Sequence, residues 1–243
     1  MTAEFILNEL KSIASPEKAK ILSGFFKTRQ GEYGAGDLFL GVVVPHIRNI
    51  AKANRKTPPT EIRTLLQSNF HEARLCALAI ITEQFKKAKE TERKEIFNFY
   101  LANIERINNW DLTDLTCPTI IGLYLLDKDD RSILYKMSES KNLWEQRISI
   151  VSTLAFIRNN DLNDTFALSK KLLFHKHHLI HKAVGWMLRE AGKRNKELLV
   201  AFLDKYAAKM PRTALRYAIE KFPQQERLYY LHKDISRHVS AIK

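Results

Sequence analysis

Trp110 and Asp114 are a pair of side chains whose types and spacing could do chemistry. They stand four residues apart, so they share one face of a helix. An aromatic ring beside a carboxylate suits a cationic target, or a cation that develops during a reaction. The alternative is an aspartate near a helix start beside an interface tryptophan. Pro118 should kink or restart the helix, and Asp111, about 100° round from Trp110, is expected to face solvent or to cap.

A second group lies in an expected helix over residues 180–194. Its apolar residues recur at helical steps: Ile180, Val184, Met187 and Ala191. A cationic stripe with one tryptophan follows the same steps on the opposite side: Lys182, Trp186, Arg189 and Lys193. Cations bind phosphates and a ring can stack on a base, so this stripe predicts a nucleic-acid surface. The alternative is a helix buried on both faces, with the basic side chains reaching past the indole to water.

A third candidate is Arg147, three residues after Trp144 in another helix with an apolar stripe. We expect it at the rim of the binding face. A phosphate contact and a local salt bridge with Glu145 or Asp161 are both compatible with its position.

Four histidines stand close together just before this basic helix and in its first turn: His175, His177, His178 and His181. His177 and His181 are one helical turn apart, as metal ligands can be. The segment lacks the glutamate of a zincin motif and a nearby Asp, Glu or Cys that would complete a site. We therefore expect a cationic turn rather than a metal centre.

Helical periodicity runs through the elements that must position these residues. The stretches expected as helices include 61–69, 71–85, 92–107, 162–174 and 196–207. Helix openings recur after 39, 34, 36 and 32 residues, at His71, Trp110, Trp144, Ile180 and Arg212. Such spacing is typical of helix–turn–helix repeats. With no flexible linker, it predicts one all-α domain over residues 1–243, an α-solenoid whose concave face is lined by the second helix of each pair.

Composition excludes several classes of protein. Of the 243 residues, 45% are hydrophobic and 28% charged, which excludes wholesale disorder. Few Gly and Pro and no Asn-Gly or Asp-Gly pair argue against an all-β fold. Two cysteines fit a reducing compartment. Because Glu4 and Glu9 stand among its apolar residues, we do not expect the N-terminal segment to be a signal peptide, and no apolar run reaches membrane length. We expect a soluble, cytoplasmic protein.

The net charge of +13 is concentrated in the second half of the chain. Residues 1–140 hold 20 basic and 18 acidic side chains, whereas residues 141–243 hold 20 basic and 9 acidic ones. This asymmetry favours a polyanionic partner, with nucleic acid first and an anionic membrane surface second. The alternative is a solubilising surface with no dedicated partner.

Four segments of the chain together resemble the DNA alkylation repair glycosylases built from HEAT-like repeats (AlkD-like). They follow the family's order between about residues 36 and 220, so the resemblance covers most of the chain. They are Gly36-Asp37-Leu38-Phe39-Leu40-Gly41-Val42 with Pro45 and Arg48; Asn109-Trp110-Asp111-Leu112-Thr113-Asp114; Leu143-Trp144-Glu145-Gln146-Arg147-Ile148; and Ala183-Val184-Gly185-Trp186-Met187-Leu188-Arg189-Glu190.

The resemblance implies a solenoid of HEAT-like repeats with a concave basic face. It also implies excision of positively charged alkylated purines, such as 7-methylguanine and 3-methyladenine, from duplex DNA. Asp114 would be the catalytic aspartate, Trp110 and Trp186 the lesion-site tryptophans, and Arg147 an arginine near the reaction centre. The residues expected to bind DNA are Arg48, Trp144, Lys182, Arg189, Lys193 and Arg194. We expect a monomer that uses no metal or cofactor.

One departure from the family concerns Val43-Val44-Pro45, where relatives can carry polar DNA-contacting residues. Two other functions stay open. A non-catalytic DNA-binding repeat protein could read altered or branched DNA, although a pure binder gains nothing from a carboxylate that phosphates repel. A protein-binding helical scaffold is the third, and the positive second half argues against it.

Overall fold

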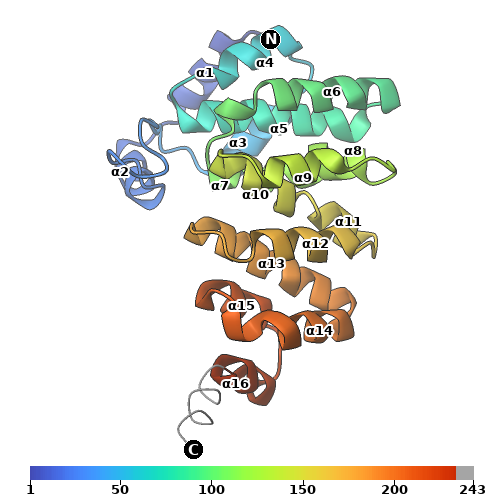
Figure 1. Cartoon of the computed structure of the whole chain (residues 1–243). Helices are drawn as coiled ribbons and strands as arrows, with labels where there is room; N and C mark the ends of the chain where they lie inside the picture. The colour runs from blue at the N-terminus through green and yellow to red at the C-terminus, as the bar shows by residue number, and fades with distance from the viewer. Residues whose placement is uncertain (234–243) are drawn as a thin grey trace, which may run out of the picture. The chain divides into compact units, whose positions relative to one another are not determined.

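The computed structural model describes residues 1–233, and the chain divides into two compact units, Met1–Tyr124 and Leu125–Lys243 (Figure 1). Helices dominate both units. Within residues 1–233 there is no strand, and an isolated bridge joins Leu38 to Phe70. None of the helices in that range is long and apolar enough to cross a membrane. The all-α prediction is confirmed.

The helices of the first unit are α1 (Ala3–Ser12), α2 (Pro16–Phe25), α3 (Val44–Ala53), α4 (Pro59–Leu66), α5 (His71–Lys87), α6 (Glu90–Ala102), a 3-10 turn (Ile104–Arg106), α7 (Trp110–Cys117) and a π-helix (Pro118–Gly122). The short helix α8 (Leu123–Leu125) contains the last residues of this unit and the first residue of the second. The central element is α5, which packs against α3, α4, α6 and α7. Twelve of its 17 residues are buried. In contrast, α2 buries none of its residues.

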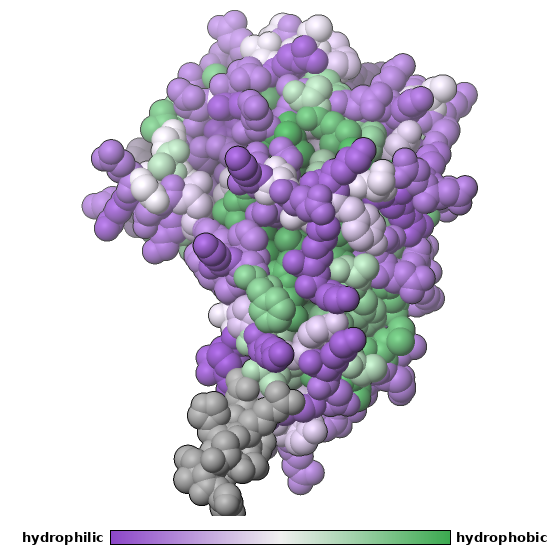
Figure 2. Space-filling view, viewed as in Figure 1, coloured by the Kyte–Doolittle hydropathy of each residue, from purple (hydrophilic) through white to green (hydrophobic). Residues whose placement is uncertain are grey.

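The helices of the second unit are α9 (Ser132–Ser138), α10 (Leu143–Val151), α11 (Leu154–Arg158), α12 (Asn163–Leu172), α13 (His178–Arg194), α14 (Lys196–Tyr206), a 3-10 turn (Ala207–Lys209), α15 (Arg212–Ala218) and α16 (Gln224–His232). Here α13 is central and packs against α10, α12, α14 and α15. Its predicted apolar stripe is fully buried: Ile180, Val184, Met187 and Ala191. Figure 2 shows a mainly hydrophilic surface interrupted by smaller apolar areas.

The expected repeat openings are confirmed to within two residues. The helices that begin there are α5 at His71, α7 at Trp110, α10 at Leu143, α13 at His178 and α15 at Arg212. The expected helix over 92–107 is shorter, because α6 ends at Ala102 and a 3-10 turn follows. The Asn103 amide donates to the Phe99 carbonyl at 2.7 Å and so caps that end.

At two positions in the family-like segments, Gly41 and Gly185, there is a steric reason why the residue is glycine. A Cβ on Gly185 would lie 2.4 Å from the Ala214 carbonyl oxygen, so the close approach of α13 and α15 requires glycine there. Gly41 has φ of +81°, and a Cβ on it would lie 2.1 Å from the Ser15 carbonyl oxygen. Both positions therefore need glycine.

Candidate functional site

The first two turns of α7 present the Trp110–Asp114 pair, with Trp110 at the first helical position and Asp114 one turn later. The Asn109 side chain caps the helix by accepting from the Trp110 N–H at 2.8 Å. The Thr113 hydroxyl lies 2.8 Å from the Trp110 carbonyl and 3.1 Å from Asp114 Oδ1. Trp110 and Asp114 are both half-buried. The shared face is thus confirmed, and the carboxylate has a hydroxyl neighbour that orients it.

The helix changes its geometry directly after this pair, as Pro118 predicts. The α-helix ends at Cys117, and Pro118 begins a five-residue π-helix. Proline cannot donate to the carbonyl of the preceding turn, so the regular ladder is interrupted there. Short π segments of this kind are frequent at functional sites.

Trp110 belongs to an aromatic cluster that sequence reasoning missed. Its ring stacks on Phe26, with centroids 5.2 Å apart and planes 16° apart. Phe25 meets the same indole edge-on, with centroids 5.8 Å apart. Phe26 is buried, but Phe25 at the end of α2 is 60% exposed. An exposed phenylalanine beside a half-buried tryptophan gives α7 an aromatic surface that a ligand ring can reach.

Behind α7 lie four buried charged side chains, which we name the buried charge cluster: Asp37, His71, Arg74 and Asp111. His71 Nε2 lies 2.7 Å from Asp111 Oδ2, and His71 Nδ1 lies 3.2 Å from Asp37 Oδ2. Arg74 Nη2 pairs with Asp37 Oδ1 at 2.7 Å. The prediction that Asp111 faces solvent is therefore wrong, although its Oδ1 does accept from the Leu112 N–H at 2.8 Å.

The pKa values of this cluster follow from burial and pairing. Burial opposes the charged imidazole, but hydrogen bonds to Asp111 and Asp37 outweigh it and raise the pKa of His71 to about 9. Burial likewise opposes the charged form of Asp37, but His71 and Arg74 outweigh it and lower the pKa of that carboxyl. At neutral pH the imidazole is therefore protonated, and both ring nitrogens donate.

In the second unit, Trp186 lines a groove of 470 Å³ together with Leu154, Ile157, Arg158, Glu190, Lys193 and Arg194. Three predicted residues, Trp186, Lys193 and Arg194, thus share one groove. Arg158, the last residue of α11, adds a cation that sequence reasoning missed. A half-exposed indole among cations is an arrangement that can hold a nucleotide.

Two cations of the predicted stripe, Lys193 and Arg189, form ion pairs with glutamates of this chain. Lys193 Nζ lies 2.8 Å from both carboxylate oxygens of Glu190. Arg189 pairs with Glu190 at 3.1 Å and also with Glu220. A phosphate must compete with these carboxylates. Lys182 is half-buried and Arg194 is exposed.

Arg147 and Trp144 are both buried on α10, with 5% and 7% exposed. Arg147 Nη1 donates to the Leu179 carbonyl, which ties α10 to the first turn of α13. Asp161, one of the expected partners, pairs instead with Arg131 at 2.6 Å. Trp144 has little surface to offer DNA directly.

Arg48 is exposed on α3 and lines a groove of 430 Å³ in the first unit. Lys52 and Lys86 line the same groove, and so does the carboxylate of Glu83. The apolar Val43 of the departure noted above is exposed at the N-terminus of this helix. Arg48 is therefore accessible and has cationic neighbours.

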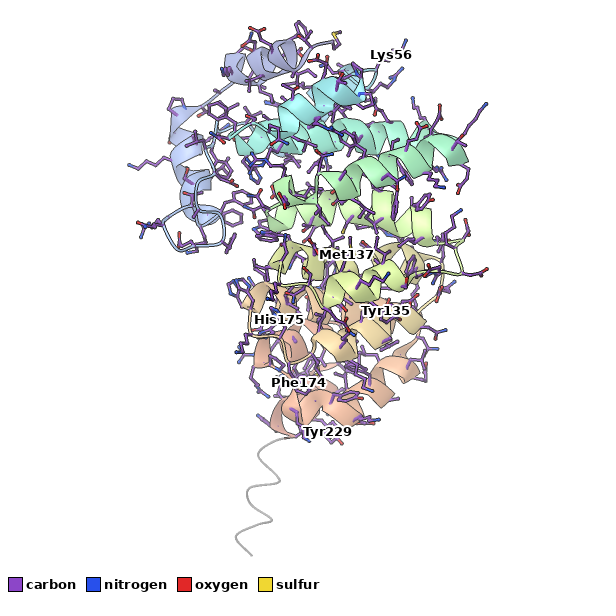
Figure 3. All side chains as sticks on the ribbon, turned by 45° about the horizontal axis from the view of Figure 1, so that its top comes forward. Lys56, Tyr135, Met137, Phe174, His175 and Tyr229 are labelled. Atoms are coloured by element: carbon purple, nitrogen blue, oxygen red, sulfur yellow. The ribbon has the colours of Figure 1, made fainter. Side chains whose placement is uncertain are left out.

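The histidine turn connects α12 and α13, where Figure 3 labels Phe174 and His175. Its side chains hold the turn together. His177 Nδ1 caps α13 by accepting from the Leu179 N–H at 3.2 Å, and the His181 Nε2 contacts the His175 carbonyl. Burial lowers the pKa of His175, His177 and His178. Burial therefore disfavours the charged form of these three rings, and the exposed Lys176 in the same turn is the cation that the expectation of a cationic turn rests on. In residues 1–233 no three His, Cys, Asp or Glu are grouped to hold a metal ion.

Comparison with known proteins identifies a family whose model matches most of the chain. The model of the family described as "DNA alkylation repair enzyme" matches residues 6–222. A predicted DNA alkylation repair enzyme from Enterococcus faecalis is similar in structure, with a TM-score of 0.70 and 16% identity over 87% of this chain and 97% of that chain. AlkD2 from Streptococcus mutans gives a TM-score of 0.55 and 16% identity over 91% and 98% of the two chains. A search of curated proteins found no match.

Proposed function

Since the chain belongs to the DNA alkylation repair enzyme family, we propose that it is a DNA glycosylase. Its substrates are positively charged alkylated purines, such as 7-methylguanine and 3-methyladenine, in duplex DNA. The observation that carries this assignment is the pair on α7, where a half-buried tryptophan and a half-buried carboxylate share one face. Such a pair suits a cationic base and the cationic sugar that forms when the base leaves.

Asp114 has the central role in the proposed reaction. Alkylation already places a positive charge on the purine, so the C1′–N bond breaks with its electron pair moving to the base, which leaves neutral. The sugar becomes an oxocarbenium-like cation, and the Asp114 carboxylate stabilises it. Water then attacks C1′ and passes a proton to the carboxylate or to solvent. The Thr113 hydroxyl, 3.1 Å from Asp114 Oδ1, orients the carboxylate for this role.

The aromatic side chains bind the lesion nucleotide in this proposal. Trp110, supported by Phe25 and Phe26, offers a ring to the cationic base. Trp186 does the same in the second unit, where Arg158 and Arg194 in its groove bind phosphates.

Arg147 is the remaining residue of the proposed catalytic site. The resemblance gives it a place near the reaction centre, and its bond to the Leu179 carbonyl fixes the direction of the guanidinium. Lys182 and Arg48 add further phosphate contacts. Arg48 is exposed, and Lys182 is half-buried.

Release of the free base from duplex DNA containing 7-methylguanine tests the proposal. The protein is incubated with this DNA in the presence of a chelator, beside Asp114→Asn and the matched control Asp129→Asn, which alters an exposed carboxylate. We expect wild type and Asp129→Asn to release base, and Asp114→Asn to bind the DNA but release none. A fully active Asp114→Asn protein would refute the assignment. Tight, salt-sensitive binding without release by wild type would indicate a DNA-structure binder instead.

A further inference from the structure

The buried charge cluster joins three segments of the first unit that are distant in the sequence. Asp37 belongs to the segment between α2 and α3, His71 and Arg74 to α5, and Asp111 to α7. His71 is 2% exposed and bonds to both carboxylates, so it is the link between the α2–α3 segment and α7. The Leu38 N–H donates to the Asn69 carbonyl and the Leu38 carbonyl accepts from the His71 N–H, so this segment meets the start of α5.

Stability alone is a weak reason to bury four charges. Removing two carboxylates and two cations from water costs several kcal/mol per ion, and packed apolar residues of similar volume often give equal or greater stability. What a hydrogen-bonded cluster adds is fixed geometry, because each bond constrains both distance and direction.

Those bonds fix the turn that carries the proposed catalytic pair. Asp111 directly follows Trp110 and stands three residues before Asp114, so a constraint on its carboxylate acts on the turn that holds both. Helix ends fray unless they are tied down. Here the Asn109 cap and the Asp111–His71 bond hold the first turn from two directions.

A second connection runs through the aromatic rings. The His71 ring lies against Phe26 and Phe39, with centroids 4.8 Å away in both cases. Phe26 in turn stacks on Trp110. A charged imidazole is attracted to the faces of such rings. The orientation of the Trp110 indole therefore depends on His71 through Phe26, besides the bond to Asp111.

From this geometry we propose that His71 is a positioning residue for base excision: held between Asp37 and Asp111, it sets Trp110 and Asp114 in their reactive arrangement. This role rests on the glycosylase function proposed above. Besides its two carboxylate partners, His71 faces the guanidinium of Arg74, and Arg106 in turn acts on Arg74. The raised pKa of His71 keeps the imidazole charged at the pH where the enzyme would work.

Two variants weaken the link while leaving the catalytic pair in place. Asp111→Asn keeps the shape of the side chain but removes its charge. A neutral His71 then still donates to Asp37, while its Nε2 can only accept from the amide of the new side chain, so an uncharged hydrogen bond replaces the ion pair and the charges of the cluster stay balanced. His71→Gln removes one of the two donors. Glu72→Gln is the matched control, because Glu72 is the next residue on α5, is equally buried, and accepts from the N–H groups of Leu40, Gly41 and Val42 instead.

The first readout is the single-turnover rate of base release with enzyme in excess, together with the affinity for lesion DNA, at a temperature where every variant is folded. We expect Asp111→Asn and His71→Gln to slow release by about ten- to a hundredfold, as for a misplaced reacting group. DNA affinity should change by less than about threefold, since a lost positioning contact lowers the rate rather than binding. Glu72→Gln should retain the wild-type rate.

The second readout needs neither DNA nor activity. In a Trp144→Phe/Trp186→Phe background Trp110 is the sole tryptophan, and its emission reports the ring environment. We expect Asp111→Asn and His71→Gln to change this emission and Glu72→Gln to leave it as it is. In the Trp144→Phe/Trp186→Phe protein with an unchanged cluster, the emission of Trp110 should also change as the pH rises through about 9, where His71 loses its proton.

Base release and Trp110 emission together test the positioning role of His71. Wild-type release by both Asp111→Asn and His71→Gln overturns the positioning role, as does an equal loss in Glu72→Gln. If wild type releases no base, the proposed function fails, and the emission of Trp110 alone decides. A change in both cluster variants but not in the control then keeps the link between His71 and Trp110, whereas unchanged emission overturns it.

Discussion

The protonated imidazole of His71 should make the stability of the protein depend on pH in a defined window. Its pKa rises from the ordinary value of 6.5 to about 9 in the folded protein, because the bonds to Asp111 and Asp37 outweigh the effect of burial. A shift of this size corresponds to about 3 kcal/mol of free energy of unfolding. This figure is the difference in unfolding free energy between the protonated and the neutral imidazole, and it does not include the cost of burying the four charges.

The sign follows from proton binding. Between pH 6.5 and 9 the folded protein holds a proton on His71 that the unfolded chain has released. The contribution is therefore complete below pH 6.5 and declines by about 1.4 kcal/mol per pH unit as the pH rises. It is lost above the folded pKa of about 9.

Urea unfolding of wild type and His71→Gln at several pH values from 6.5 to 8.5 measures this effect. The useful quantity is the difference between the two proteins at each pH, because other groups cancel in it. Burial raises the pKa of the Cys76 thiol to about 12, which destabilises both proteins alike at alkaline pH. We expect the wild-type advantage to shrink steadily across the window. Parallel curves for the two proteins would refute the charged, doubly bonded His71.

Two further predictions concern α13. Gly185→Ala places a Cβ 2.4 Å from the Ala214 carbonyl oxygen, so we expect a loss of about 2 kcal/mol or more, as for an overpacked core; a melting temperature equal to that of wild type would contradict the close packing of α13 and α15. Arg194→Ala should lower the slope of log affinity for DNA against log salt by about 0.9. Arg189→Ala should lower it less, because Glu190 and Glu220 already neutralise that guanidinium; an equal change in the two variants would argue against the ion pairs.

The pairs that share a helix face were predictable because helical periodicity is local. Residues three or four apart meet on one face wherever the helix forms, so the Trp110–Asp114 pair and the buried stripe of α13 followed from spacing alone. The interruption at Pro118 is equally local, because it depends on a missing N–H. The repeat of helix openings also needed no tertiary information.

Contacts between distant segments were not predictable in this way. His71 lies 34 residues from Asp37 and 40 from Asp111, and no spacing rule connects them. Asp111 was expected to face solvent because its angle on α7 differs from that of Trp110, yet α5 packs against α7 on that side. A helical angle gives the direction of a side chain but not what lies there.

The surface charge shows the same division. The excess of basic residues in the second half is a property of the sequence, and the pair formed by Lys193 with Glu190 follows from a spacing of three. The pairing of Arg189 with Glu220, 31 residues away, exists only because α13 and the end of α15 lie together. Local spacing therefore determined the helices, their faces and the candidate pair. The packing of helices distant in sequence decided which charges are buried, which are neutralised and which stay accessible to DNA.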